Sequence, residues 1–397
     1  DASVPFQQVF FLQEGDAPVF RFAYCDSFLG SKYKTSQWYR SIYICDVFNE
    51  NIFNRIEIPI NKLKDGRNWA RIAYLIAAPG GDIFALFNIE RYSDYVGFKV
   101  IKVNAFSGQI EAESAFNYSS SRGGFFESCY GCFCNGHFYV ADFETINKLN
   151  PTTLSIEKRV NIAYPEPINN SYNPTKERTT FFLRTDGQNI FYVKYMEERQ
   201  RGSAPSTAEG YSYVALCELN PNNLQETIVQ EKLEIALKNQ LERIKPQGLT
   251  VENGVAYLAL SGYYEGMVTS TSLENASATF QFSESVNGLA SNQNGVFYFP
   301  RFPVLFEYNL NDLSVRMETI STPKAVSPFQ PDATIAGNDL IVISKYGFRS
   351  DFQSVVASYD TANNVVNYVK NFVFPSDPLN GDPEVFKEAG FITAVQN

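Results

Sequence analysis

A turn followed by a short apolar strand recurs along this chain about once every 50 residues, and this repeat constrains the fold more than any other feature. Several copies open on Asn-Gly or Asp-Gly, pairs that accept the positive φ angles of a type I′ hairpin turn. The pattern therefore predicts a series of similar hairpins. Their turns begin at Gly15 (a weaker copy), Gly80, Asn135, Asp186, Asn253, Asn294 and Gly337.

A second pattern follows most copies of the first. It consists of an apolar residue, then Asn or Asp, then a short polar turn and an alternating strand. We expect the Asn or Asp side chain to cap its own turn. The fifth repeat carries only a degenerate version, near Leu273, and the other copies begin at Cys45, Val103, Leu149, Leu219, Tyr308 and Tyr359.

Together the two patterns predict four antiparallel strands per repeat, which we label A to D. A period of about 50 residues suits a four-stranded blade. We therefore expect an all-β protein, a seven-bladed β-propeller that forms a single domain over residues 1–397; eight blades are the alternative. The expected blades are 7–58, 72–113, 130–162, 180–234, 247–283, 288–320 and 332–374, and the tail 375–397 is expected to add a closing strand.

The blade pattern resembles that of the quinoprotein-like and YVTN-like propeller superfamily, whose blades carry a similar Asn-Gly turn, Tyr-Val strand and Leu-Asp-Pro-x-Thr turn. The resemblance covers nearly the whole chain and implies the architecture. It implies no particular function, because propellers serve as enzymes, lectins and scaffolds alike. The tryptophan signature of quinone-dependent dehydrogenase blades is missing, since the chain has only Trp38 and Trp69.

Composition agrees with a strand-rich fold, because Phe (34) and Tyr (24) far outnumber Met (3). A hydrophobic content of 44% is enough for a large core. One segment departs from the repeat. In 230–245 the residues Leu233, Leu237, Leu241 and Ile244 have helical spacing, which predicts a short helix between the fourth and fifth blades. The alternative is a strand followed by a loop.

The formal net charge of −10 argues against a nucleic-acid-binding protein, which needs a basic surface, and leaves room only for a local basic patch. No apolar run reaches the length of a membrane-spanning helix. An even count of six cysteines fits an oxidising compartment, so we expect a secreted, extracellular or periplasmic glycoprotein. Its candidate glycosylation sequons begin at Asn117, Asn169 and Asn275.

The cysteines are predicted to form disulfides. Cys25 and Cys45 lie on two neighbouring strand-like segments, and a hairpin between these segments makes them the first expected pair. Cys129, Cys132 and Cys134 form a compact cluster, for which we expect a local or blade-linking disulfide with Cys217 as the candidate partner. The alternative is that the cysteines are buried thiols that behave as small apolar residues.

The single histidine, His137, excludes metal sites that need several histidines and leaves only one base for a Ser-His-Asp or Cys-His arrangement. It follows an Asn-Gly turn, so we expect a partly buried strand residue. Its spacing from the cysteine cluster is too compact for a zinc site. The sequence also holds no nucleophile elbow, phosphate-binding loop or dinucleotide fingerprint. We expect no cofactor and no metal, and the sequence leans away from an enzyme.

A ligand is expected on one face of the blades. In a four-stranded blade, the B–C loops and the D–A connections open on the same face, and here they collect Trp, Tyr and Arg, the residue types enriched at binding hot spots. The candidate ligand-binding residues are Trp38, Tyr39, Arg40, Trp69, Arg71, Tyr92, Arg122, Arg178, Tyr263, Tyr264, Tyr346 and Arg349.

Three functions are compatible with these features. The first is an extracellular, non-enzymatic recognition or adhesion module that binds a glycan or a protein partner through this face. The second is a hydrolase or lyase that acts on a saccharide or lactone at the mouth of a central channel. The third is a structural subunit of an extracellular assembly, which large exposed apolar patches would indicate.

Overall fold

The structure is a computed structural model that describes residues 12–14, 17–19, 21–26, 39–46, 52–91, 94–119, 129–164, 175–199, 210–237, 245–252, 255–261, 266–270, 280–282, 290–291, 296–301, 304–309, 312, 314–319, 329–336, 339–346, 353–372 and 389–394. The chain divides into two compact units. Unit 1 contains Asp1–Phe6, Arg91–Phe98 and Ser114–Leu289, and unit 2 contains Gln7–Glu90, Lys99–Glu113 and Ala290–Asn397.

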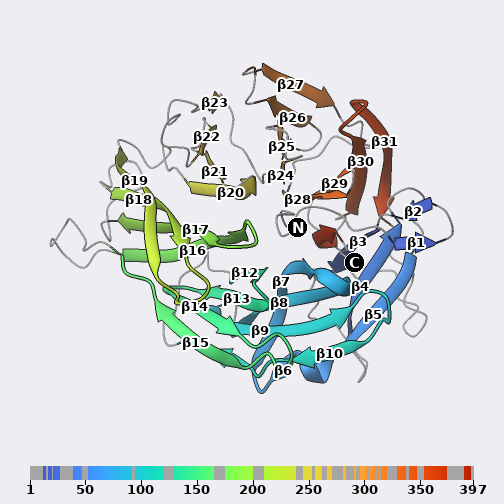
Figure 1. The fold of residues 1–397 in the computed structure, drawn as a ribbon, viewed down its shortest axis with the longest axis horizontal. Coiled ribbons are helices and arrows are strands. Elements are labelled where there is room, and N and C mark those ends of the chain that lie inside the picture. The colour runs from blue at the N-terminus through green and yellow to red at the C-terminus, as the bar shows by residue number, and fades with distance from the viewer. Residues whose placement is uncertain are drawn as a thin grey trace. The chain divides into compact units, whose positions relative to one another are not determined.

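Unit 1 contains three four-stranded sheets, in each of which the strands pair antiparallel in chain order (Figure 1). The first sheet is β12 (Tyr130–Cys134), β13 (His137–Asp142), β14 (Thr145–Leu149) and β15 (Ile156–Asn161); the second is β16 (Thr175–Thr185), β17 (Ile190–Arg199), β18 (Gly210–Leu219) and β19 (Glu226–Leu237); the third is β20 (Lys245–Glu252), β21 (Val255–Ser261), β22 (Gly266–Ser270) and β23 (Phe280–Phe282).

Unit 2 contains three more four-stranded sheets. Two follow chain order, and in the other a strand from the C-terminal end pairs with β3. Their strands are β24 (Ala290–Ser291), β25 (Val296–Arg301), β26 (Val304–Asn309) and β27 (Ser314–Thr319); β28 (Phe329–Ala336), β29 (Asp339–Tyr346), β30 (Gln353–Asp360) and β31 (Val365–Phe372); and β32 (Ala389–Ala394), β3 (Arg21–Asp26), β4 (Tyr39–Asp46) and β5 (Ile52–Pro59).

The β32–β3 pairing confirms the extra strand expected in the tail, and it corrects the position of the first turn. The Gly15 turn was expected between strands A and B of the first blade. The segments on either side of it, β1 (Leu12–Glu14) and β2 (Ala17–Val19), instead form a separate hairpin. In the sheet that contains β3, β4 and β5, the position of strand A is taken by β32, which comes from the C-terminal end of the chain.

The remaining sheet has six strands, and the residues of β9 are divided between the two units. Five of its strands pair in the order β10-β9-β8-β7-β6, and β11 pairs with β9 beyond β10. These strands are β6 (Lys64–Asp65), β7 (Asn68–Ala78), β8 (Asp82–Arg91), β9 (Asp94–Asn104), β10 (Ile110–Glu113) and β11 (Asn117–Tyr118).

The predicted all-β class and the four-stranded antiparallel sheets are confirmed. In a β-propeller, the strands of each sheet pair in chain order, and a strand from the C-terminal end completes the sheet that contains the N-terminal strands. The sheets observed here, including β32-β3-β4-β5, have this strand pairing. Seven blades and their boundaries stay predictions. In the part of the chain that the structure describes, the helical elements are two 3₁₀ turns, Ile60–Lys62 and Pro79–Gly81, and no helix could cross a membrane.

The predicted helix in 230–245 is wrong over its first half. Residues up to Leu237 belong to β19, which pairs with β18 along its whole length. Register shifts interrupt this pairing between Ser212 and Val214 and again between Leu216 and Cys217. Such irregularities disturb the alternation of a strand, and cross-strand pairing outweighs a helical spacing of leucines. Residues 238–244 lie outside the described part.

Within a sheet, the strands that have a paired neighbour on each side, which we call inner strands, are more buried than the last strand, which we call the outer strand. In β8 the run from Ile83 to Phe87 is fully buried, and in β13 every residue from Phe138 to Asp142 is buried. Such continuous burial needs cover on both faces of the strand. Outer strand β15 carries Glu157, Lys158 and Arg159 toward solvent. Each sheet therefore depends on its neighbours for most of its stability.

Large apolar side chains fill the space between the second and third sheets of unit 1. Each of them contributes about 1.5–3 kcal/mol when it is fully buried, so this layer is a main source of stability for unit 1. The buried residues of the layer are Phe191, Val193, Tyr195, Val214, Leu216, Leu249, Val251, Ala256 and Leu258.

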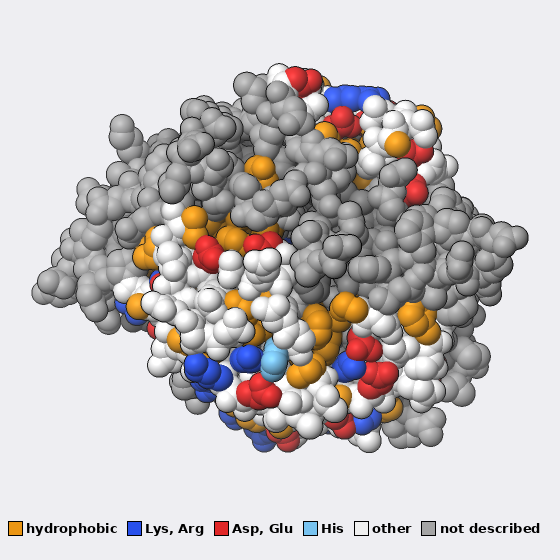
Figure 2. Space-filling view, viewed as in Figure 1, with side chains coloured by type: hydrophobic (Ala, Val, Ile, Leu, Met, Phe, Trp, Pro, Cys, Tyr) orange, Lys and Arg blue, Asp and Glu red, His pale blue; other side chains and the backbone are white. Residues whose placement is uncertain are grey.

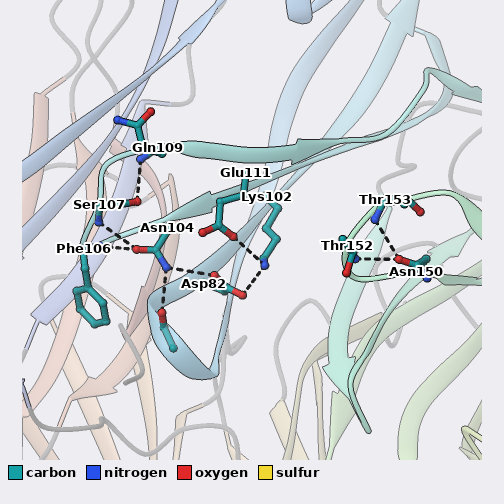
Figure 3. A network of polar contacts seen from close by, with 11 residues as sticks. Asp82, Lys102, Asn104, Phe106, Ser107, Gln109, Glu111, Asn150, Thr152 and Thr153 are labelled. Carbon is teal, nitrogen blue, oxygen red and sulfur yellow. Dashed lines mark hydrogen bonds and ion pairs between the residues drawn. The ribbon is translucent and has the colours of Figure 1, made fainter.

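Four of the predicted Asn/Asp turns between strands C and D lie within the described residues, and these four form as predicted (Figure 3). The side-chain oxygen of Asn150 accepts the backbone N–H groups of Thr152 at 2.9 Å and Thr153 at 3.0 Å. Asn104, Asn220 and Asp360 accept two backbone N–H groups in the same way. One polar side chain thus satisfies two donors that the strand pairing leaves over.

The same turns place their fifth residue at a positive φ angle. Leu154 has a φ of 55° and Leu224 a φ of 61°, values that are uncommon for a residue other than glycine. Both leucine side chains are buried. Their burial is worth about 1.5–3 kcal/mol each and offsets a backbone cost of about 1–2 kcal/mol.

We expect Asn150→Ala to lower the free energy of unfolding by about 1 kcal/mol, because two backbone donors of the turn lose their acceptor. Urea denaturation at pH 7 measures the effect. Thr152→Ala is the control, since it keeps the backbone N–H that Asn150 accepts. Equal stability of the two variants would show that the side-chain cap contributes nothing.

Candidate functional site

One end of the first sheet of unit 1 joins three segments of the chain. The turns β12–β13 and β14–β15 lie at one end of this sheet, and the β13–β14 turn lies at the other with the segment that follows β15. There, Ile162 donates its backbone N–H to the carbonyl of Glu144 at 2.6 Å, and Thr180 of β16 donates to the carbonyl of Phe143 at 3.2 Å. This is the B–C and D–A end on which a ligand is expected.

We call this group the loop-end site. Its members are Tyr95, Asp142, Phe143, Glu144, Tyr164 and Arg178, all in unit 1. The two halves of the site differ in character. Asp142 and Tyr95 form a buried pair, whereas Glu144 and Arg178 reach solvent.

The turn itself is strained at Phe143, which has a φ of 51°. Its side chain is buried, and its ring packs edge-on against Tyr95 with 4.8 Å between ring centroids. A residue other than glycine in this region costs on the order of 1–3 kcal/mol, and such strain is found most often where a protein binds or reacts. Tertiary contacts on both sides hold this turn in place.

Asp142 is a buried carboxyl group, only 4% exposed. The hydroxyl of Tyr95 donates to its Oδ1 at 2.8 Å. Burial raises the pKa of Asp142 to about 6, while hydrogen bonds from Tyr95 and Ser119 and the charge of Arg159 oppose part of the increase. The Cys129 thiol lies in the same surroundings, where burial and the Asp142 charge raise its pKa well above the ordinary value.

Arg178 enters the site from β16. Its Nη1 lies 3.8 Å from Oε2 of Glu144, which is an ion pair too long for a hydrogen bond, and its guanidinium lies 5.7 Å from the ring centroid of Tyr164. The Tyr164 hydroxyl is held 3.0 Å from that of Thr180. The Nε–H of Arg178 is buried, and no described residue accepts its hydrogen bond.

The structure places only some of the predicted ligand-binding residues. Arg178 belongs to the loop-end site. Trp69 lies in unit 2 on β7, with Nζ of Lys64 at 4.7 Å from its ring centroid. The backbone positions of Tyr39, Arg40, Arg71 and Tyr346 lie in β4, β7 and β29. Trp38, Tyr92, Arg122, Tyr263, Tyr264 and Arg349 lie outside the described residues.

His137 is a partly exposed strand residue, as expected. It lies at the turn end of β13, where Nδ1 is 3.0 Å from the carbonyl of Asn135 and Nε2 is 3.3 Å from Glu157. Figure 2 shows the chain's single histidine, in pale blue, at the surface. Asp142 lies at the opposite end of the same strand, five residues or about 17 Å away, so the two do not form a His-Asp pair. Groups of three metal-ligating side chains are absent from the described residues.

The cysteines differ from the prediction. Cys129, Cys132, Cys134 and Cys217 are buried thiols and form no disulfide. Thr185 donates a hydrogen bond to Sγ of Cys134 at 3.1 Å. Burial raises the pKa of the Cys132 thiol, as it does for Cys129, so these groups stay protonated and are poor nucleophiles.

The expected Cys25–Cys45 disulfide conflicts with the observed register. Cys25 pairs with Ile42, and Cys45 pairs with Phe22, so the two positions are offset by three residues along adjacent strands. This offset corresponds to about 10 Å, and Cα atoms more than about 7 Å apart cannot be bridged without movement of the backbone.

Sequence reasoning identified Arg178 but missed the other half of the site. Asp142-Phe143-Glu144-Thr145 contains no Gly, Asn or Pro, and Asp142 alone is a weak turn signal. The stronger signal was the very short interval between two strand-like segments, which required a tight turn there.

Comparisons with known proteins leave the family open. No family model and no curated protein matches this sequence. The fold is similar to AztD of Citrobacter koseri (TM-score 0.48, 9% identity, 95% of this chain and 98% of that one), BamB of Moraxella catarrhalis (0.43, 12%, 93% and 89%) and NirN, a dihydro-heme d1 dehydrogenase (0.48, 9%, 94% and 74%). At this level of similarity, function is not assigned, and the fold class rests on the strand pairing.

We expect Asp142→Asn to stabilise the protein at pH 7 and to have little effect at pH 4. The raised pKa means that the native state keeps a proton which the unfolded chain releases, so wild-type stability falls as the pH rises from about 4 to about 6. Ionisation of Asp142 in the native state lowers the free energy of unfolding by on the order of 3 kcal/mol. Urea denaturation of the wild type and of Asp142→Asn, from pH 4 to pH 7, measures this loss. An equal effect of the substitution at both pH values would contradict the account.

Proposed function

We propose that this chain is an extracellular or periplasmic recognition module that binds a glycan or a protein partner through its B–C and D–A face, without catalysis. The observation that supports the proposal best is the loop-end site, where the partly exposed side chains of Arg178 and Glu144 lie beside the strained turn at Phe143. Backbone strain of this kind costs on the order of 1–3 kcal/mol and is found most often at functional sites. Arg and Tyr are also the side chains on which binding energy concentrates.

The proposed location outside the cytoplasm rests on the sequence. Among the sequons, Asn117 is half-buried, and its side-chain nitrogen donates to the carbonyl of Ala115 at 3.0 Å and to the hydroxyl of Ser114 at 3.4 Å. That nitrogen would have to give up both bonds to carry a glycan. We therefore propose Asn169 and Asn275, which lie outside the described residues, as the attachment sites.

A hydrolase or lyase is the second candidate, because the pKa of Asp142 near 6 suits a general acid or base at neutral pH. The second carboxylate of the loop-end site, Glu144, is paired with Arg178 and is 41% exposed, so it does not serve as a second buried acid. A saccharide- or lactone-cleaving activity that Asp142→Asn abolishes would favour this candidate over the first.

The third candidate, a structural subunit, finds less support. Exposed large apolar residues of the described strands include Ile228 on β19, Met317 on β27 and Val365 on β31. Each lies on the outer strand of a different sheet, and single exposed apolar residues are normal for a protein surface.

Blocking each end of the first sheet of unit 1 tests the proposed binding face. Glu144→Trp places a bulky side chain at the loop end, and Glu157→Trp places one at the turn end of the same sheet; the two glutamates are 41% and 35% exposed. We expect the partner found on a glycan array or by native purification to bind at least tenfold more weakly to the first variant only. Failure of both searches, or loss of binding only in the second variant, would contradict the proposal.

A further inference from the structure

The β13–β14 turn is held closed by contacts from other segments of unit 1. The carbonyl of Phe143 accepts the backbone N–H of Thr180 at 3.2 Å. The next carbonyl, that of Glu144, accepts the backbone N–H of Ile162 at 2.6 Å. The ring of Phe143 also packs against Tyr95, with 4.8 Å between ring centroids. These contacts hold Phe143 at its positive φ of 51°, so the closed turn depends on its surroundings more than on its own backbone preference.

Asp142 is buried directly beside this turn, where its side chain is only 4% exposed. Four described groups from other segments face its carboxyl group. The hydroxyl of Tyr95, on β9, donates to Oδ1 at 2.8 Å, and the side chain of Ser119, after β11, donates a second hydrogen bond. Arg159, on β15, acts through its charge, and the Cys129 thiol lies just before β12. An ionised carboxylate has about four acceptor sites, which these two donors do not fill.

Ionisation of Asp142 has two opposing effects on the closed turn. The negative charge strengthens the hydrogen bonds that Tyr95 and Ser119 donate, which favours closure. The same charge loses its hydration when it is buried, which favours opening. Burial is the larger effect, because it raises the pKa of Asp142 to about 6 in spite of these bonds. The closed turn therefore favours the protonated carboxyl group.

We propose that the β13–β14 turn is a pH-sensitive latch, which is closed against Tyr95 when Asp142 is protonated and opens locally more often when Asp142 is ionised. Opening brings the carboxylate into water and lets the backbone of Phe143 relax, so one movement relieves two unfavourable features. A proton taken up from solvent restores the closed form. This inference concerns a conformational change at the loop-end site and does not depend on what the site binds.

Hydrogen–deuterium exchange of the backbone amides of Thr180 and Ile162 tests the latch, because opening of the turn frees both of them. After correction for the intrinsic effect of pH on exchange, we expect their protection factors to fall roughly tenfold from pH 5 to pH 7. The reference amides are those of Asn150 and Leu154, which close the β14–β15 turn at the opposite end of the sheet and should keep their protection. An equal fall at both ends would show global unfolding and would overturn the local latch.

Asp142→Asn keeps the shape of the side chain and removes its ionisation. We expect this variant to lose the pH dependence at Thr180 and Ile162 and to protect both amides about tenfold better than the wild type at pH 7. Asp339→Asn is the matched control. Asp339 is also a buried carboxyl group whose pKa is raised by burial, but it lies on β29 in unit 2. Its substitution should leave the pH dependence at the loop end unchanged.

Tyr95→Phe distinguishes the latch from a purely steric role of the turn. The variant keeps the ring that packs on Phe143 but removes a donor to the ionised carboxylate, so the fall in protection from pH 5 to pH 7 should be at least about twofold larger than in the wild type. An equal or smaller fall in this variant, or a fall of wild-type size in Asp142→Asn, would show that Asp142 does not control the turn. These measurements need no ligand, so failure of the latch leaves the proposed function to be decided by Glu144→Trp.

Discussion

Burial of the inner strands on both faces is the constraint on which the rest of this structure depends. Strands such as β8 and β13 have no face for water, so each sheet is stable only when neighbours cover it. Polar contacts add to this packing within unit 1, where the Tyr139 hydroxyl donates to the carbonyl of Pro221 and Lys158 reaches that of Asn223. The loops are thus held by sheets that are themselves fixed by their neighbours.

The two ends of the sheets differ in how well their polar groups and backbone are accommodated. At the turn end, Asn104, Asn150, Asn220 and Asp360 satisfy the backbone of their own turns. At the loop end of the first sheet of unit 1, strain at Phe143, a buried carboxyl at Asp142 and an unmet donor at Arg178 occur within one turn and its neighbours. Stability given up in one place is characteristic of a site shaped for binding.

The repeat predicted the parts of the fold that depend on local turn chemistry. Asn135-Gly136 has φ angles of 47° and 72°, both positive as a type I′ turn requires, and Asn150 caps its turn as expected. Pairing between distant segments was beyond local reasoning. Residues 230–237 of the expected helix belong to strand β19, and the register of β3 and β4 separates Cys25 from Cys45. Arg178 was found from its residue type and position, whereas Glu144 and Tyr164 become its neighbours only through tertiary packing.

The side-chain resonances of Arg178 in an NMR spectrum test the central claim most directly, because Arg178 is the partly exposed cation of the loop-end site. Addition of the partner found on a glycan array or by native purification should shift these resonances. The side-chain resonances of Arg316, which forms an exposed ion pair on β27, should not change. Arg178 resonances that stay unchanged at saturating partner, or equal shifts for both arginines, would contradict the account.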